Sequence, residues 1–483
     1  MIRQGTYSVL SLVIPLAVGL ATVPQIIEAL GVTRFGLLTL AWAIVGYVSI
    51  LDLGIPRAMT ARIAAGNATP IKTRKAAHVG LVLLAALGIL LALLIALISR
   101  TIPTRFHVEQ TEYVQSSLWL SACVPFVFIS SGLRGILEGH HCFLSTSLAR
   151  LFFGLVTFGT PILVLPIAPS LDAMLAILFS GRVIGTLFLA AVSMPYIREP
   201  LSAKDIIPEA KSLLSFGSWM AAGNLISSIL VYADRFVLAS SKISGELAYY
   251  TTSYEFISKL LVVPSAFSSV LFPRMIEKSN GDHKDELFLS NGIAITAGML
   301  APITIGVGLF SYEVIAYWIN ASFAEKAGTP LLILSSGILI NSTAQITQAH
   351  LLASSEAKWM ARLQAVEAII YIPIIFIAVN LWGLSGLSAC CSIRSLVDAA
   401  ALLSRCRKNT STHDMARACA IHFFVLLCAI APILASQMNY PARLTILLGA
   451  ILSSAYLVTL VTRSKSIRKT SRSDRNFQKS FKN

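Results

Sequence analysis

Apolar runs long enough to cross a lipid bilayer recur along almost the whole chain. A transmembrane helix needs about 20 consecutive apolar residues, and such runs follow one another up to Thr462 with only short polar breaks. Only 13% of the 483 residues are charged, whereas soluble domains carry about a quarter. The sequence therefore predicts an all-α, multi-pass membrane protein with no separate soluble domain.

The apolar runs are numerous enough for about fourteen transmembrane helices. Their expected positions are 6–27, 36–55, 78–99, 115–137, 145–167, 172–195, 212–240, 247–272, 287–312, 328–353, 361–380, 384–404, 416–435 and 442–462. The first run follows Arg3 and resembles a signal peptide in its charge order. It is long enough to span the membrane and ends without a convincing small-residue cleavage site, so we expect an uncleaved helix.

Lys and Arg residues are concentrated in alternate breaks between the helices. The breaks after even-numbered helices are rich in them, as Arg57, Arg62 and Arg74 show for the second helix and Arg134 and Arg150 for the fourth, and the other breaks are poor. Because cytoplasmic loops carry the excess of Lys and Arg, the rich breaks are expected to be cytoplasmic. The segment 463–483 is also basic, with Asp474 as its only acid. Both termini are therefore predicted to be cytoplasmic.

The formal net charge of +15 is explained by these loops and by a tail beside an anionic leaflet, so no nucleic-acid partner is expected. The seven cysteines lie mostly in apolar runs or beside basic loops, and they are expected to be packing residues. The chain contains no Gly-x-x-x-x-Gly-Lys-Ser/Thr loop, no Gly-x-Ser-x-Gly elbow and no His-Glu-x-x-His pair. We therefore expect no metal, no cofactor and no catalytic residues.

A weak internal repeat divides the chain. Gly5 and Gly217 open the first and seventh helices, and Arg182 and Arg394 lie in the sixth and twelfth, at the same offset of 212 residues (217 − 5 and 394 − 182). Pro56-Arg57 and Pro273-Arg274 recur at nearly that offset. Six helices separate the copies, so both halves would have the same orientation, as in transporters built from parallel repeats. The predicted parts are two parallel six-helix bundles at 1–200 and 201–408, two further helices at 409–462, and a basic cytoplasmic tail at 463–483.

Charged residues within the apolar runs are the best candidates for a functional site. A charge at the centre of a transmembrane helix costs about 2.5 to 3.5 kcal/mol, so it is rarely kept without a role or a partner. Arg182, Lys259 and Arg394 are expected roughly 15 to 18 Å from the membrane face at 1.5 Å per residue. Three cations at that depth favour an anionic substrate, so we predict that these three residues bind it.

The acidic residues near these cations have two interpretations. Glu255 lies four residues before Lys259, and Asp398 lies four residues after Arg394, so each pair shares a helix face and can neutralise itself. The alternative is that Glu255 and Asp398 compensate charge or couple an ion in the site. Glu367 is a lone acid in the eleventh helix, either a proton carrier or a residue hydrogen-bonded to a neighbouring helix.

Two further sites are ambiguous from the sequence. Asp234 and Arg235, near the outer end of the seventh helix, are either an interfacial anchor or further charge-compensating residues of the site. Asp52, near the cytoplasmic end of the second helix, is followed by Gly54 and Pro56. It either caps the next segment or gates the cavity.

Short motifs in and beside the predicted helices match a known family. They are Leu30-Gly31-Val32-Thr33-Arg34-Phe35-Gly36, Leu51-Asp52-Leu53-Gly54-Ile55-Pro56-Arg57, Gly135-Ile136-Leu137-Glu138-Gly139, Asp234-Arg235-Phe236-Val237-Leu238, Tyr249-Tyr250 and Leu271-Phe272-Pro273. Together with the number and order of the helices, they resemble the Wzx-type O-antigen and polysaccharide flippases. These flippases are a branch of the multidrug, oligosaccharidyl-lipid and polysaccharide exporter superfamily.

This resemblance implies a function and partners. It implies a flippase that carries a polyisoprenyl diphosphate-linked oligosaccharide across the bacterial inner membrane by alternating access. It also implies a cation-lined cavity between the two halves, last helices that help to accommodate the lipid, and a polysaccharide polymerase and chain-length machinery as partners. One alternative is a cation-coupled multidrug exporter of the same superfamily, against which the buried cations argue. The other is a membrane-bound glycosyl- or acyltransferase, for which the sequence offers no catalytic pattern.

The alternation of basic breaks predicts a topology that reporter fusions can test. Fusions after residues 70, 205 and 410 should report the cytoplasm, and fusions after residues 108, 320 and 438 should report the periplasm. Reversal at two or more of these sites would mean that the helices are miscounted.

Overall fold

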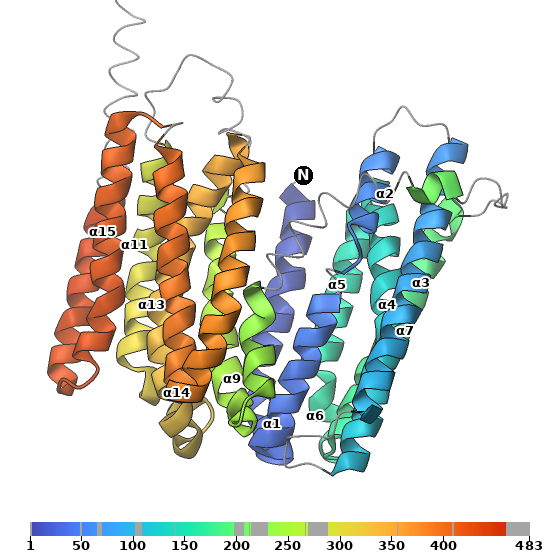
Figure 1. Cartoon of the computed structure of the whole chain (residues 1–483), viewed down its shortest axis with the longest axis horizontal. Helices are drawn as coiled ribbons and strands as arrows, with labels where there is room; N and C mark the ends of the chain where they lie inside the picture. The colour runs from blue at the N-terminus through green and yellow to red at the C-terminus, as the bar shows by residue number, and fades with distance from the viewer. Residues whose placement is uncertain are drawn as a thin grey trace, which may run out of the picture. The chain divides into compact units, whose positions relative to one another are not determined.

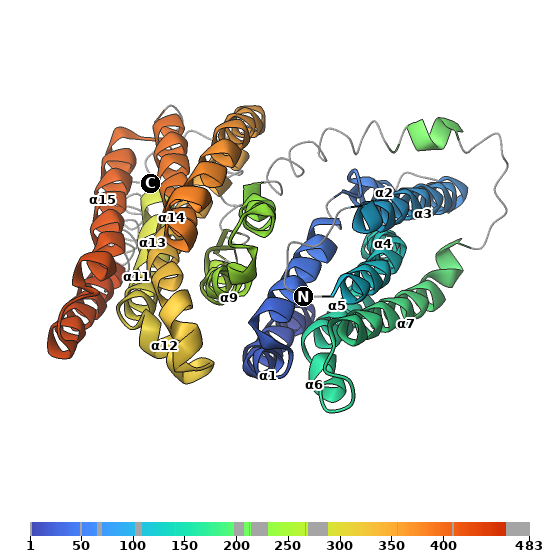
Figure 2. The ribbon, with the colours of Figure 1, turned by 60° about the horizontal axis from the view of Figure 1, so that its bottom comes forward.

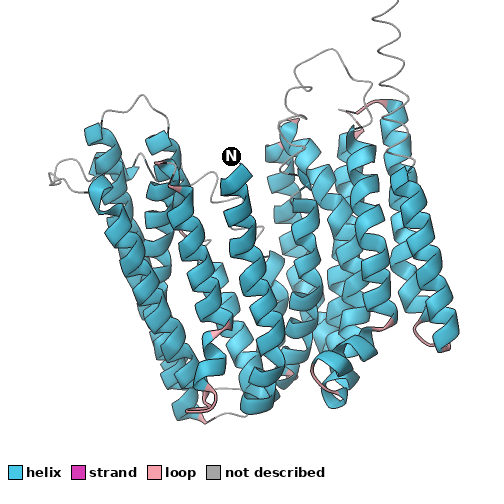
Figure 3. Cartoon of the chain, turned by 180° about the vertical axis from the view of Figure 1, so that it is seen from behind, coloured by secondary structure: helices cyan, strands magenta, loops and turns pink. Residues whose placement is uncertain are grey.

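In the computed structural model the described residues are 2–48, 51–64, 70–101, 109–140, 142–197, 207–211, 213, 230–265, 267–268, 288–354, 356–407 and 410–459. In these ranges the chain forms helices joined by turns, without a strand (Figure 3). The predicted all-α polytopic fold is confirmed. Gly217, Pro273 and Arg274, on which much of the repeat argument depends, lie outside the described residues.

Nine helices in the described ranges are long and apolar enough to cross a membrane. They are Ile14–Gly46, Thr73–Arg100, Gln110–Gly139, Leu171–Ile197, Leu289–Leu309, Ala321–Ala353, Lys358–Cys406, Thr412–Ala435 and Tyr440–Thr459. The expected number of about fourteen stays a prediction, because much of the predicted helix 212–240 falls outside the description.

The chain forms two compact units, Met1–Ala248 and Tyr249–Asn483. The helices of the first unit are α1 (Ile2–Val48), α2 (Ile55–Ala64), α3 (Pro70–Thr101), α4 (Gln110–Gly139), α5 (Phe143–Phe158), α6 (Thr160–Val164) and α7 (Leu171–Ile197), followed by the short η1 (Ser244–Glu246). α4 packs against α2, α3 and α7, and α1 packs against α5 (Figure 1). The finer division predicted at 200, 408 and 462 stays a prediction.

The second unit is built around a central helix. Its elements are α9 (Leu247–Ser258), which begins at the end of the first unit, η2 (Lys259–Leu261), α11 (Phe288–Leu309), α12 (Ser311–Trp318), α13 (Ala321–Ala353), α14 (Ala357–Cys406), α15 (Thr412–Ala435) and a final helix at 440–459. α13 contacts α11, α12, α14 and α15 (Figure 2). Buried side chains such as Leu300, Leu339 and Val425 form the core between these helices.

Single glycines replace two of the predicted loops. α1 contains the first predicted helix and the part of the second up to Val48, and it reverses at Gly31 (φ 77°, ψ 162°). α14 contains the eleventh and twelfth predicted helices and reverses at Gly383 (φ 61°, ψ −142°) (Figure 1). Side chains are strongly disfavoured in these backbone regions, where glycine is nearly alone. The two halves of each helix therefore lie next to each other with a register that one residue sets.

Two short helices, α2 and α12, were not predicted. α2 lies in a break that was assigned to a basic cytoplasmic loop. Ile55, Met59 and Ile63 recur at helical spacing and are buried, and Thr60 Oγ1 donates to the carbonyl of Gly135 in α4 at 2.9 Å. An amphipathic segment of this length has too few apolar residues to register as a membrane span.

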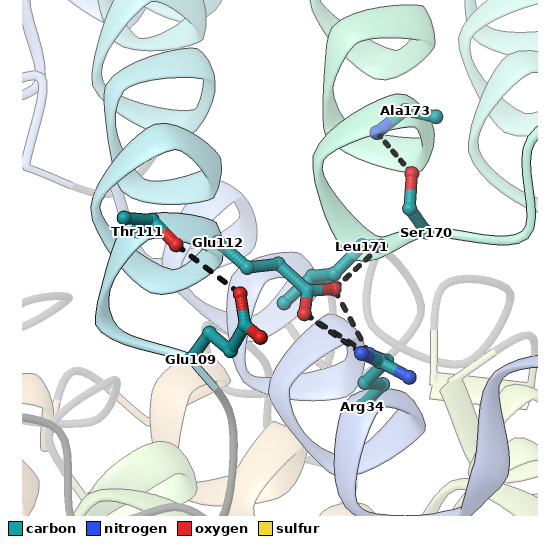
Figure 4. Close-up of polar contacts among 7 residues, drawn as sticks. All are labelled: Arg34, Glu109, Thr111, Glu112, Ser170, Leu171 and Ala173. Atoms are coloured by element: carbon teal, nitrogen blue, oxygen red, sulfur yellow. Dashed lines mark hydrogen bonds and ion pairs between the residues drawn. The ribbon is translucent and has the colours of Figure 1, made fainter.

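Glu112, near the start of α4, joins three helices of the first unit. Its carboxylate accepts two hydrogen bonds of 2.9 Å from Nε and Nη2 of Arg34 in α1, and one of 3.3 Å from the N–H of Leu171, the first residue of α7 (Figure 4). The Glu112 side chain is 13% exposed and that of Arg34 is 44% exposed. This contact fixes the start of α7, the helix that carries Arg182.

The Gly31 reversal predicts a backbone-specific loss of stability. A Cβ at Gly31 or at Gly449 would meet nothing within 4 Å, but Gly31 alone of the two has a positive φ. We expect Gly31→Ala to cost about 1 to 3 kcal/mol through strain, and Gly449→Ala, in a helix, to be neutral or slightly stabilising. Thermal midpoints of the detergent-solubilised proteins measure this, and equal midpoints would contradict the assignment.

The Arg34–Glu112 contact predicts a modest electrostatic contribution to stability. Glu112→Gln keeps an acceptor oxygen but removes the charge, so we expect a loss of about 0.5 to 1 kcal/mol, limited by the partial exposure of Arg34. The matched control is Glu109→Gln, because Glu109 is exposed, accepts a 3.5 Å hydrogen bond from Thr111, and acts on Arg34 less than Glu112 does. If both variants shift the thermal midpoint equally, the contact is not stabilising.

Candidate functional site

Arg182 lies near the middle of α7, about 16 Å along the helix from Leu171 at 1.5 Å per residue. Its Nη2 atom donates to Thr157 Oγ1 of α5 at 3.5 Å, and its Cζ atom lies 4.9 Å from the centroid of the Phe153 ring. Its Nε atom is buried without a hydrogen-bond partner. Arg182 is therefore held by a hydroxyl and an aromatic face inside the first unit.

Arg134 of α4 extends the positive charge of Arg182 along the unit. Its Nε atom donates to the carbonyl of Ser130, one turn earlier, at 3.4 Å, so the side chain turns back along α4. Arg134 is within electrostatic range of both Arg182 and Arg150 of α5, and also of the acids Glu138 and Asp52, which offset part of its charge. Three guanidinium groups from α7, α4 and α5 therefore follow one another in the first unit.

Arg134 and Arg150 were not predicted as site residues. Both were expected in a basic cytoplasmic break, although Arg134 lies inside the predicted span 115–137 and inside α4. Its position within that span was the signal that could have identified it. Arg150 lies eight residues into α5, well inside the helix.

Asp52 lies in the turn between α1 and α2, outside the helices that are long enough to cross a membrane. Its Oδ1 atom accepts the N–H of Gly54 at 2.9 Å, and its carbonyl accepts the N–H of Ile55, the first residue of α2. Burial raises the pKa of Asp52 to about 6, against the opposing effects of the Gly54 N–H, Arg57 and Arg134. Leu53 has a φ of 52°, a left-handed conformation that is unusual for a bulky residue. Asp52 therefore shapes the start of α2.

Asp234 and Arg235 lie inside the first unit, in the helical segment 230–240. They are 2% and 4% exposed. The N–H of Arg235 donates to Asp234 Oδ1 at 2.8 Å, and its Cζ atom lies 5.0 Å from the centroid of the Tyr232 ring. Such burial favours an internal role over an interfacial anchor.

In the second unit, Lys259 forms an ion pair with Glu255, as the spacing of four residues indicated. The side chains are 37% and 41% exposed. The charge of Lys259 is thus balanced locally, whereas Arg182 contacts a hydroxyl and a ring.

Arg394, Asp398 and Glu367 form a polar cluster within α14. The guanidinium Cζ of Arg394 lies 5.2 Å from the centroid of the Tyr371 ring, and its Nε atom is buried without a hydrogen-bond partner. Asp398 is within electrostatic range of Arg394 and of Glu367, which lies in the other half of α14. Arg394 and Asp398 are therefore not an isolated pair, because the hairpin brings Glu367 from outside their helix face.

Within the described residues no cluster of His, Cys, Asp or Glu could hold a metal ion. The seven cysteines are free, and Cys123, Cys391, Cys406 and Cys428 are buried. The candidate functional residues in the described part of the chain are therefore charged side chains within the two helical units.

Comparison with known proteins supports this architecture. Residues 2–279 match the family described as "Polysaccharide biosynthesis protein". A putative O-antigen transporter of Shigella flexneri is 25% identical over 405 residues, which cover 82% of this chain and 96% of that protein.

Two solved structures share the fold. The lipid II flippase MurJ, in an inward closed conformation, aligns with a TM-score of 0.69 at 14% identity, over 96% of this chain and 99% of that one. A multidrug resistance MATE family transporter of the MOP superfamily, inward-facing, aligns with a TM-score of 0.64 at 16% identity, over 86% and 98%. The family match covers more than half of the chain. The chain therefore belongs to the family of polysaccharide biosynthesis proteins, in agreement with the resemblance of its short motifs to the polysaccharide flippases.

Proposed function

We propose that this protein moves a polyisoprenyl diphosphate-linked oligosaccharide, the repeat unit of O-antigen or another surface polysaccharide, across the bacterial inner membrane by alternating access. The family and the Shigella flexneri relative support a polysaccharide precursor as cargo. The fold shared with a flippase and a transporter supports a carrier rather than an enzyme.

The environment of Arg182 is the observation that carries the proposal. This guanidinium lies in an apolar helix, is held by Thr157 and Phe153, and has a buried Nε without a partner. An uncompensated cation in a membrane interior is expensive to keep. A diphosphate would supply the missing negative charge, and the planar fork of Arg can donate two hydrogen bonds to it.

The other charged residues have supporting roles in this proposal. Arg394 and Lys259 join Arg182 in binding the diphosphate, and Arg134 and Arg150 extend the positive potential of the first unit. Lys259 contributes less than the two arginines, because Glu255 balances its charge.

Charge compensation and gating complete the assignment. Glu255, Asp398 and Asp234 compensate positive charge when no substrate is bound. Arg235, next to Asp234, belongs to the same charge-compensating group. Asp52 acts as a gate through the turn that leads into α2, where Leu53 has a left-handed backbone.

In the cell, we expect the chain to lie in the inner membrane with both termini cytoplasmic, and a polysaccharide polymerase with its chain-length machinery to receive the product. A cation-coupled multidrug exporter is the competing hypothesis. It would raise resistance to organic cations in a strain lacking drug efflux, without restoring surface glycan.

The decisive experiment replaces Arg182. Arg182→Ala should weaken diphosphate binding about tenfold to a hundredfold, because a charge-assisted hydrogen bond contributes about 1.5 to 3 kcal/mol, and export should be lost. Arg182→Lys should keep part of the export, because charge survives without the fork. Surface polysaccharide is measured in a strain lacking the native gene and normalised to membrane protein level.

The matched control is Arg100→Ala, which removes an exposed cation from the end of α3 and should leave export unchanged. Full export by Arg182→Ala at normal abundance would remove Arg182 from the site. Loss of folded protein in both Arg182 variants would instead assign it a structural role.

A further inference from the structure

The reversal at Gly383 aligns two pairs of side chains in α14. Glu367 lies 16 residues before Gly383 and Asp398 lies 15 residues after it (383 − 367 and 398 − 383). Both are about 23 Å from the turn at 1.5 Å per residue. One turn closer to Gly383, Tyr371 and Arg394 face each other in the same way. The hairpin therefore stacks a carboxyl pair on an arginine–tyrosine pair.

The carboxyl pair lies inside the hairpin. Glu367 and Asp398 are close enough to act on each other electrostatically, Glu367 is only 8% exposed, and its Oε1 atom is buried without a hydrogen-bond partner. Ionised carboxylates only accept hydrogen bonds, and two of them at one site repel each other. Two carboxyl groups that face each other in such a place therefore favour the binding of one proton.

Arg394 is the positive charge near Glu367 and Asp398. It acts on both carboxyl groups, while Cys391, Tyr371 and Tyr254 of α9 act on Arg394. α13 packs along α14 and carries no titratable side chain in its stretch 327–349. Among the described residues, Arg394 is thus the one full positive charge acting on the two carboxyl groups.

The charge balance depends on the number of bound protons. With one proton bound to the carboxyl pair, Arg394 (+1) and the remaining carboxylate (−1) give a net charge of zero. With no proton bound, both carboxyl groups are ionised and the net charge is −1. With two protons bound, only Arg394 is charged and the net charge is +1. A neutral cluster is the cheapest of these to bury in an apolar helix pair, so the pair holds one proton in the empty protein.

We infer that Glu367 and Asp398 form a proton-binding site whose occupancy controls the charge that Arg394 offers to an anion. This inference rests on the proposed function only for the identity of the anion. Uptake of a second proton removes the last compensating carboxylate and strengthens binding of a phosphate group at Arg394. Loss of that proton restores the carboxylate and favours release. By linkage, anion binding strengthens proton binding by the same factor.

Infrared spectroscopy of the purified full-length chain tests the proton site without any transport. The wild type should show the C=O band of a protonated, buried carboxyl group at neutral pH. Glu367→Gln and Asp398→Asn should each remove it, and the matched control Glu325→Gln, at an exposed acid of α13, should not. Because the wild-type band is measured first, failure of one variant to fold leaves the test intact.

Three outcomes would overturn the inference. They are no such band in the wild type at neutral pH, a band that survives in both variants, and a band that sodium removes at constant pH. The last outcome would make the pair a sodium site.

The link to the anion is tested with inorganic pyrophosphate as the probe. Its affinity for the wild type should fall by up to about tenfold per pH unit as the pair loses one proton. The double variant Glu367→Gln/Asp398→Asn should show only the change due to pyrophosphate's own ionisation, and equal pH dependence of both proteins would refute the link. Absence of pyrophosphate binding with the infrared band present would count against the proposed diphosphate site and leave the proton site standing.

Discussion

A charge in hydrocarbon has no water to solvate it, and the structure of this protein depends on how its few buried charges are held. Arg182 is held by a hydroxyl and an aromatic ring, whereas Arg394 stacks on a tyrosine beside two carboxyl groups. Both arginines lie near the middle of an apolar helix. Among the described residues, Arg394 has the carboxyl groups of Glu367 and Asp398 near it, whereas Arg182 contacts Thr157 and Phe153, so the two arginines have different electrostatic surroundings.

The glycine reversals give this chemistry its geometry. A loop of several residues would allow the two halves of α14 to shift by one helical turn against each other. The single-residue reversal at Gly383 fixes their register. Glu367 then meets Asp398, and Tyr371 meets Arg394. In the first unit, Glu112 has a comparable effect, because it joins α1, α4 and the first residue of α7 and so fixes the helix that carries Arg182.

Much of the fold could be predicted because membrane helices are long and apolar. The span 384–404 agrees closely with the second half of α14, and 115–137 lies within α4. α2 and α12 were missed, since ten and eight residues cannot form an apolar run of spanning length. Arg134 was assigned to a loop because charge counting treats every basic residue near a helix end alike, whereas its side chain bends back along α4.

The sequence by itself determined the kind of protein, the approximate helix positions and the charged residues inside them, because hydrophobicity and charge are local properties of the chain. It also paired Glu255 with Lys259, since four residues along one helix share a face. Only the tertiary structure decided which neighbour each buried charge meets on another helix. From its spacing, Asp398 could be paired with Arg394 alone. It lies near Glu367 because the backbone reverses at Gly383 and sets the register between two helix faces.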